Sequence, residues 1–183
     1  ALPIFNADIA QINEIEDNSA DYIISTYNPL SFVGDPQAVI NEAYRILKNG
    51  GVAQITVQGY YNALYSKVNN SLADASELYD IFENKKVKWN PEVPKLWQLP
   101  KSNMEKMFNK AGFIDIESRG IATITQPQGE DFDPENKQLG PLSRKLNEDQ
   151  DFYDALLKIE IQSGKDQNAV DRAMNILTLG KKQ

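Results

Sequence analysis

The feature that most constrains this 183-residue sequence is a strand, a helix and a second strand in close succession. Residues 20–27 (ADYIISTY) form a short, apolar, β-rich run after the turn-like Asp17-Asn18-Ser19, which predicts a buried strand. Asp35-Pro36 then offers an N-cap and a proline at the first helical position, and Asn49-Gly50-Gly51 offers a helix stop. Val52–Val57 reads as the next strand. A strand–helix–strand unit of this length joins parallel strands, so the sequence predicts an α/β fold.

The second half of the chain repeats the alternation of helices and strands. Ser102–Glu105 matches a capping box that opens a helix, and Gly112 ends that helix. Phe113–Ser118 follows as a strand. A further helix is expected over residues 148–162, and Met174–Leu179 is expected as the last strand.

We expect one domain over residues 1–183, with two segments outside the regular alternation. Residues 60–100 are rich in tyrosine and tryptophan with a weak helical pattern, which predicts a helical, aromatic insertion that could serve as a substrate lid. Residues 126–147 are acidic and rich in proline and glycine at their start, which predicts an exposed loop.

Composition excludes several kinds of chemistry. The chain contains no histidine and no cysteine, so it can form neither a Ser-His-Asp triad nor a thiolate metal site, and we expect no metal. A net charge of −7 opposes binding to a nucleic-acid backbone, and no apolar run is long enough to span a membrane. We therefore expect a cytoplasmic protein whose partners include neither nucleic acid nor membrane.

A set of motifs in a fixed order resembles the class I, Rossmann-like S-adenosylmethionine-dependent methyltransferases. Asp8-Ile9 and the stretch 16–21 (EDNSAD) resemble the family's segment around strand 4. Residues 41–51 (NEAYRILKNGG) are similar to its "EaxRvLKPGG" motif, with Asn49 where proline usually stands. Ala111-Gly112-Phe113 matches the "AGF" before strand 6, and residues 175–181 resemble strand 7. The resemblance implies a truncated methyltransferase sheet that retains the strand 4-5-7-6 half with flanking helices.

One family signature has no counterpart in this sequence. None of the ten glycines stands at the G-x-G spacing of the family's cofactor loop, and the resemblance places the chain start near strand 3. We therefore expect this chain to be a C-terminal portion that lacks the glycine-rich loop, cannot bind the cofactor and is inactive as a fragment. Without strand 1, residues 22–25 would form an unpaired edge, so the fragment is also expected to form a homodimer.

The resemblance assigns four residues to cofactor binding. Asp8 would meet the adenine amine, and the backbone amide of Ile9 would meet a ring nitrogen. Tyr27 ends the predicted strand, and Asn28 begins the run that resembles the family's loop facing the methyl donor. Two of these assignments have structural alternatives, because Asp8 fits a turn and Asn28 before proline is an ordinary turn signal.

Candidates for substrate binding are Tyr60 and Tyr61, which follow the Val52–Val57 strand at the ligand-binding edge of an α/β sheet. The alternative for both is packing against the next helix. We expect Arg45 to be solvated, and we name no catalytic side chain, because methyl transfer from a sulfonium can proceed by positioning and desolvation.

These observations predict an S-adenosylmethionine-dependent methyltransferase that acts on a small molecule. The first alternative is a non-catalytic assembly or interaction module derived from the same fold. The second is a nicotinamide-dependent reductase, although the glycine-rich signature of such enzymes is absent.

Overall fold

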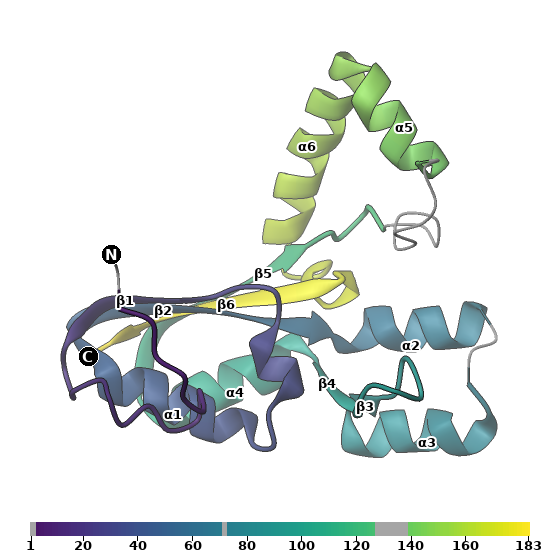
Figure 1. Ribbon diagram of the computed structural model, residues 1–183. Coiled ribbons are helices and arrows are strands. Elements are labelled where there is room, and N and C mark those ends of the chain that lie inside the picture. Colours follow the sequence, from purple (N-terminus) through teal and green to yellow (C-terminus); the bar gives the residue numbers. More distant parts are fainter. Residues whose placement is uncertain (1–2, 71–72, 127–138) are drawn as a thin grey trace.

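The computed structural model describes residues 3–70, 73–126 and 139–183, which form one mixed sheet with helices against it (Figure 1). In chain order the strands and longer helices are β1 (Ala20–Ser25), α1 (Pro36–Ile46), β2 (Leu47–Gly59), α2 (Tyr60–Asn69), α3 (Ala75–Asn84), β3 (Lys86–Val87), β4 (Leu96–Leu99), α4 (Lys101–Ala111), β5 (Phe113–Ile121), α5 (Pro141–Glu148), α6 (Gln150–Lys165) and β6 (Asn175–Lys182). Two 3-10 helices, η1 (Pro29–Phe32) and η3 (Val170–Arg172), complete the described elements.

The main body of the sheet has the strand order that the sequence predicts. β2 pairs in parallel with β1 on one edge and antiparallel with β6 on the other, and β6 pairs antiparallel with β5. The resulting order β1-β2-β6-β5 corresponds to the predicted 4-5-7-6 half of the methyltransferase sheet. The parallel pairing of β1 with β2 confirms the strand–helix–strand unit.

The segment 60–100 is less purely helical than expected. It contains α2 and α3, but it also contains β4, which pairs in parallel with β2 at Gln58 and Gly59 and so extends the sheet. β3 pairs antiparallel with β4. Tyr60, Ala63, Ile81 and Val87 form a small buried core of their own between these elements.

The helix α1 begins where the sequence predicts and ends earlier than expected. The Asp35 side chain accepts a hydrogen bond from the Gln37 amide, and Pro36 occupies the first turn. The helix stops at Ile46, so the expected stop at residues 49–51 is wrong. Gly50 instead has φ +81° inside a bulge of β2, where the pairing register with β1 shifts.

The cap of α4 comes from a distant residue. The predicted capping box at Ser102 is wrong, because the helix starts at Lys101 with no side-chain cap from its own segment. The amide of Lys101 instead donates to Asp171 Oδ1 at 2.7 Å. Gly112 ends the helix in the left-handed conformation, as predicted.

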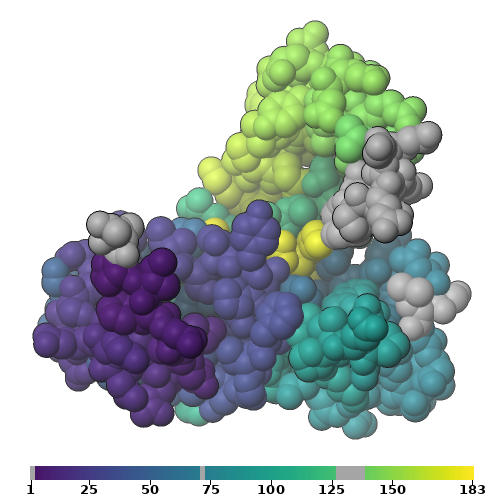
Figure 2. Space-filling view, in the orientation of Figure 1, coloured from purple at the N-terminus to yellow at the C-terminus, as the bar shows by residue number. Residues whose placement is uncertain are grey.

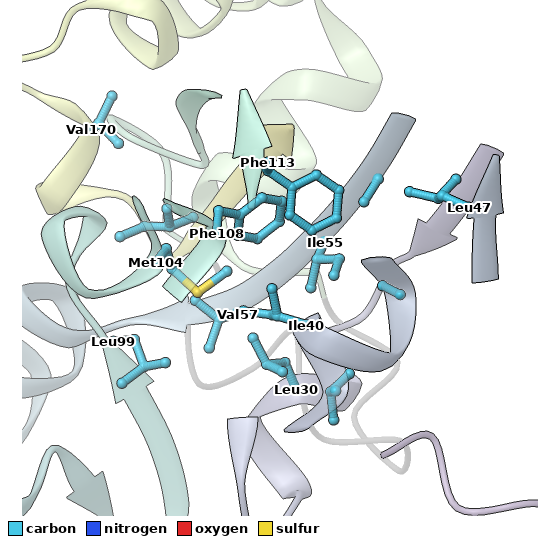
Figure 3. Close-up of a cluster of buried hydrophobic side chains, with 14 residues drawn as sticks. Leu30, Ile40, Leu47, Ile55, Val57, Leu99, Met104, Phe108, Phe113 and Val170 are labelled. Atoms are coloured by element: carbon cyan, nitrogen blue, oxygen red, sulfur yellow. The ribbon is translucent and has the colours of Figure 1, made fainter. Parts of the chain in front are cut away.

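The core lies between the sheet and the helices α1 and α4, which cover one of its faces (Figure 1). Phe108 from α4 and Phe113 from β5 place their ring centroids 4.9 Å apart, beside Met104, Ile55 and other apolar side chains (Figure 3). Truncating one of these phenylalanines to alanine would cost about 3–5 kcal/mol of stability.

Helices α5 and α6 form a hairpin that projects from the body of the molecule (Figures 1 and 2). The expected exposed loop 126–147 is therefore wrong at its C-terminal end, where Pro141 opens α5 from the first helical turn. Residues 127–138 of that expected loop lie outside the described residues. The helix expected over residues 148–162 is confirmed as α6, with Asp149 as its N-cap.

Arg45 on α1 binds the N-terminal segment over residues 12–17. Its Nη2 donates to the carbonyl oxygens of Ile12 at 3.0 Å and Ile15 at 2.9 Å, while its guanidinium also binds Glu42 and Asp17. Glu42 in turn accepts a hydrogen bond from the Ile12 amide at 2.7 Å. The expectation that Arg45 is solvated is wrong, because its guanidinium hydrogen-bonds two carboxylates and two backbone carbonyls, which come from α1 and from residues 12–17.

The outer edge of β1 carries exposed apolar side chains. Tyr22 is 70% exposed and Ile24 is 66% exposed, and no other described strand pairs with this edge. Residues 22–25 carry no charged side chain. The nearest charge, Asp21 at the start of the strand, forms an ion pair with Lys48. An edge of this kind can recruit a strand from a second molecule.

We expect Arg45→Lys to loosen the N-terminal segment. A lysine has three donors on one atom and cannot reach Glu42, Asp17 and two carbonyls together, so the amides of Ile12 and Ile15 should exchange with solvent several-fold faster. Hydrogen exchange followed by mass spectrometry measures this. Arg144→Lys on the exposed surface of α5 is the control, and equal protection in both variants would contradict the role of Arg45.

We expect the 183-residue chain to self-associate through β1. Ile24→Lys places a charge on the edge and should shift the chain to monomer in sedimentation velocity. Phe82→Lys on α3 is the matched control, because Phe82 is 64% exposed and lies far along the chain from β1. A wild-type monomer across a hundredfold concentration range, or dissociation by Phe82→Lys alone, would show that β1 is not the contact.

Candidate functional site

The carboxyl ends of three strands meet at one edge of the sheet. β1, β2 and β5 all run toward this edge, and the antiparallel β6 begins there. Asn175, the first residue of β6, is the register partner of both Gln58 on β2 and Ile121 on β5. Open α/β sheets bind ligands at this edge, so the residues that follow these strands are the first place to search for a site.

Asn28 belongs to a polar layer at this edge. Its Nδ2 donates to Asn175 Oδ1 at 2.7 Å, and its backbone amide donates to Thr56 Oγ1 at 3.1 Å. Thr56 Oγ1 donates in turn to the carbonyl of Ser25 at 3.1 Å. The remaining acceptor, Asn28 Oδ1, is buried and finds no partner among the described residues. A buried acceptor without a donor costs roughly 1–3 kcal/mol, which makes this atom a candidate ligand contact.

The backbone around Asn28 is strained. Tyr27 has φ 61° and Asn28 has φ 60°, so two consecutive residues that carry side chains are left-handed. Each costs about 1–2 kcal/mol, and such residues cluster at functional sites. Tyr27 itself is 95% exposed, so its side chain is open to solvent beyond the end of β1.

A cavity of about 650 Å³ lies beyond the ends of β2 and β5. Its size is within the range of small-molecule sites. The residues that line it come from α2, from the segment after β5 and from η3: Tyr61, Asn62, Tyr65, Thr123, Ile124, Gln126, Ala169 and Arg172.

The structure separates the two tyrosines that the sequence predicts for substrate binding. Tyr61 lines the cavity and is 51% exposed. Tyr60 is only 3% exposed and packs with Ala63 and Ile81, with Lys85 Nζ 4.6 Å from its ring centroid. The packing alternative therefore describes Tyr60, because the first residue of α2 turns toward the α2–α3 core and the second turns toward the cavity.

Glu160 on α6 holds one wall of the cavity in place. Its carboxylate accepts hydrogen bonds from the backbone amides of Thr123, Ile124 and Thr125. Burial raises the pKa of the Glu160 carboxyl, but these amide donors outweigh burial and hold the pKa below its usual range. The same contact joins the projecting helix α6 to the end of β5.

The other two residues assigned to the cofactor, Asp8 and Ile9, lie in the segment that precedes β1. Asp8 Oδ1 accepts a hydrogen bond from the Ala10 amide at 2.9 Å, which is the turn geometry of the structural alternative. Ile9 packs against the main core and lines a second, apolar cavity of about 380 Å³. Thr26 and Pro29, which flank Tyr27 and Asn28, line this cavity as well.

Several residues of this region give no signal in the sequence. Thr56, Asn175, Thr123 and Arg172 come from four separate segments and reach the edge only through strand pairing and packing. Within residues 3–70, 73–126 and 139–183, no group of three acidic residues is arranged to hold a metal ion. None of the helices in these ranges is long and apolar enough to cross a membrane.

Residues 2–55 match the family described as methyltransferase domain. No curated protein matches the sequence.

Solved structures share the fold over nearly the whole chain. An S-adenosylmethionine-dependent methyltransferase of Thermotoga maritima, described as a possible histamine N-methyltransferase, superimposes with a TM-score of 0.55 at 17% identity over 97% of this chain and 62% of its own. A methyltransferase of Mesorhizobium loti superimposes with a TM-score of 0.52 at 13% identity, over 96% of this chain and 67% of its own. One of Archaeoglobus fulgidus superimposes with a TM-score of 0.50 at 14% identity, over 97% of this chain and 66% of its own. The chain thus spans about three fifths of the Thermotoga protein's length, and at these identities the likeness shows the fold.

We expect Glu160→Gln to lower the free energy of unfolding by about 1–2 kcal/mol at pH 7, because a charged acceptor for backbone amides is lost from a partly solvated site. The folded pKa of Glu160 is depressed, so its contribution is complete above the unfolded pKa of about 4.3 and is lost as the pH falls through the folded pKa. The difference between wild type and variant should therefore vanish in acid.

Urea unfolding of both proteins between pH 7 and pH 2.5 measures this difference. Glu148→Gln, on the exposed end of α5, is the control and should have little effect at any pH. A difference for Glu160→Gln that is independent of pH would contradict the assignment.

Proposed function

We propose that this chain catalyses methyl transfer to a small molecule, because its residues 2–55 match the methyltransferase domain family and its fold is similar to that of S-adenosylmethionine-dependent methyltransferases. The observation that carries the proposal is the pairing of this fold with a cavity at the carboxyl edge of its parallel strands. The absence of histidine and cysteine is compatible with it, because the methyl donor arrives already activated.

The residues of this chain fit one end of the cofactor. An apolar cavity lined by Ile9, Thr26 and Pro29 suits a flat adenine ring, and Asn28 Oδ1 is a buried acceptor without a partner among the described residues. No G-x-G turn stands in the sequence to hold the amino-acid end. When bound, the cofactor supplies a methyl group on a sulfonium.

The remaining task of the chain is to position the methyl acceptor. We propose that the cavity beside Tyr61 receives it, and that segment 60–100 helps to cover it. Asn175 orients the Asn28 side chain and Thr56 binds its backbone amide, while Glu160 binds the backbone of the cavity wall at Thr123. The acidic composition supports a small-molecule acceptor over a nucleic acid, and the lack of cysteine supports a cytoplasmic location.

A second candidate function is an assembly module that uses the fold without catalysis. It is favoured by the exposed apolar edge of β1, where Tyr22 and Ile24 face solvent. This candidate predicts self-association without any binding of small molecules at the cavity.

We expect the 183-residue chain to bind S-adenosylmethionine only weakly, because it lacks the glycine turn that contacts the cofactor in the family it resembles. Isothermal titration calorimetry at millimolar cofactor should give no saturable heat. A dissociation constant in the micromolar range would contradict this prediction.

Methyl transfer is tested with the protein expressed from its natural gene. Formation of S-adenosylhomocysteine is measured with a panel of small hydroxyl, amine and carboxylate compounds. Product formation with one acceptor class supports the proposal. Cofactor binding without any product, or neither binding nor product, favours the assembly module.

A further inference from the structure

The cavity beside Tyr61 has an unusual charge for this protein. The chain carries a net charge of −7, yet the described residues that line the cavity include one cation, Arg172, and no carboxylate. Arg172 is exposed at the end of η3 and has no ion-pair partner among the described residues. A guanidinium in this position can bind a carboxylate through two parallel hydrogen bonds.

Two described carboxylates that contact the cavity wall or adjoin it in the chain are already engaged. Asp171, the neighbour of Arg172, accepts the Lys101 amide at 2.7 Å and caps α4. Glu160 accepts the amides of Thr123, Ile124 and Thr125 from behind the wall. The carboxylates of Asp171 and Glu160 thus bind backbone amides of other elements. Neither pairs with Arg172, whose guanidinium can therefore bind a ligand.

The rest of the lining suits a planar, apolar body. Tyr61 and Tyr65 lie one turn apart on α2, at 51% and 60% exposed, and Ile124 on the facing segment is 56% exposed. Aromatic side chains offer a large contact area at low cost in conformational entropy. A ring placed against them would remove exposed apolar surface from water.

The wall also has unused hydrogen-bonding capacity. Asn62 and Thr123 both line the cavity, and Asn62 Nδ2 and Thr123 Oγ1 are buried without a partner in the described part of the chain. A buried donor without a partner costs free energy, and a ligand oxygen that bonded to Asn62 Nδ2 would recover that cost.

We infer that the cavity beside Tyr61 binds a small aromatic carboxylate, with the carboxylate on Arg172 and the ring against Tyr61 and Tyr65. This inference deepens the proposed function, on which it rests for the further statement that the carboxylate is the methyl acceptor. It assigns the cavity an anionic ligand, because an aromatic amine would find no carboxylate among the lining residues that the structure describes.

Three probes of nearly the same shape test the inference on the 183-residue chain. Benzoate, benzamide and benzylamine carry charges of −1, 0 and +1 on one ring, and their dissociation constants are measured by NMR titration. We expect benzoate to bind about 5- to 20-fold more tightly than benzamide, and benzylamine to bind most weakly. Arg172→Gln should abolish the preference for benzoate, and Arg144→Gln on α5 should preserve it. Circular dichroism confirms that both variants are folded.

Equal affinity for benzoate and benzamide, tighter binding of benzylamine, or an unchanged benzoate affinity in Arg172→Gln would overturn the inference. Tyr61→Leu provides a second test, because it keeps the charge and should weaken all three probes together. The inference and the proposed function fail separately. Arg172-dependent benzoate binding without methyl transfer by the natural protein would retain the ligand class and reject the enzyme.

Discussion

The whole fold depends on strand β2, because it pairs with three other strands, more than any other described strand does. It pairs in parallel with β1 and β4 along one edge and antiparallel with β6 along the other. β6 in turn pairs with β5. Its alternate residues Ala53, Ile55 and Val57 are buried in the core that α1 and α4 cover. Both the order of the sheet and the position of its core follow from this one element.

The same strand positions the candidate site. Thr56 near its end binds the backbone of Asn28, and Gln58 accepts hydrogen bonds from Trp89 and from Gln98 on β4. The chain then enters α2 directly after Gly59, which brings Tyr61 to the cavity. Gly59 is required there, since a Cβ would lie 2.1 Å from the Ala173 carbonyl oxygen.

The candidate site was only partly predictable from the sequence. Asn28 and Tyr61 could be singled out because each follows an apolar run that ends at the ligand-binding edge of a parallel sheet. Tyr60 could not be separated from Tyr61, since neighbouring residues at the start of a helix point in different directions that only packing defines. Arg172 and Thr123 carry no local pattern, and they meet Tyr61 only because η3 and the end of β5 pack beside α2.

The sequence by itself determined the features that depend on neighbouring residues: the Asp35 cap of α1, the left-handed stop at Gly112 and the parallel pairing of β1 with β2. Their physics lies within a few residues of backbone geometry or in a short crossover. Tertiary structure decided the features that join distant segments. These are the cap of α4 by Asp171, the fastening of residues 12–17 by Arg45, the extension of the sheet by β4 and the cavity itself. Each requires a donor and an acceptor, or two surfaces, that become neighbours only after the sheet has formed, so no local pattern of residues could specify them.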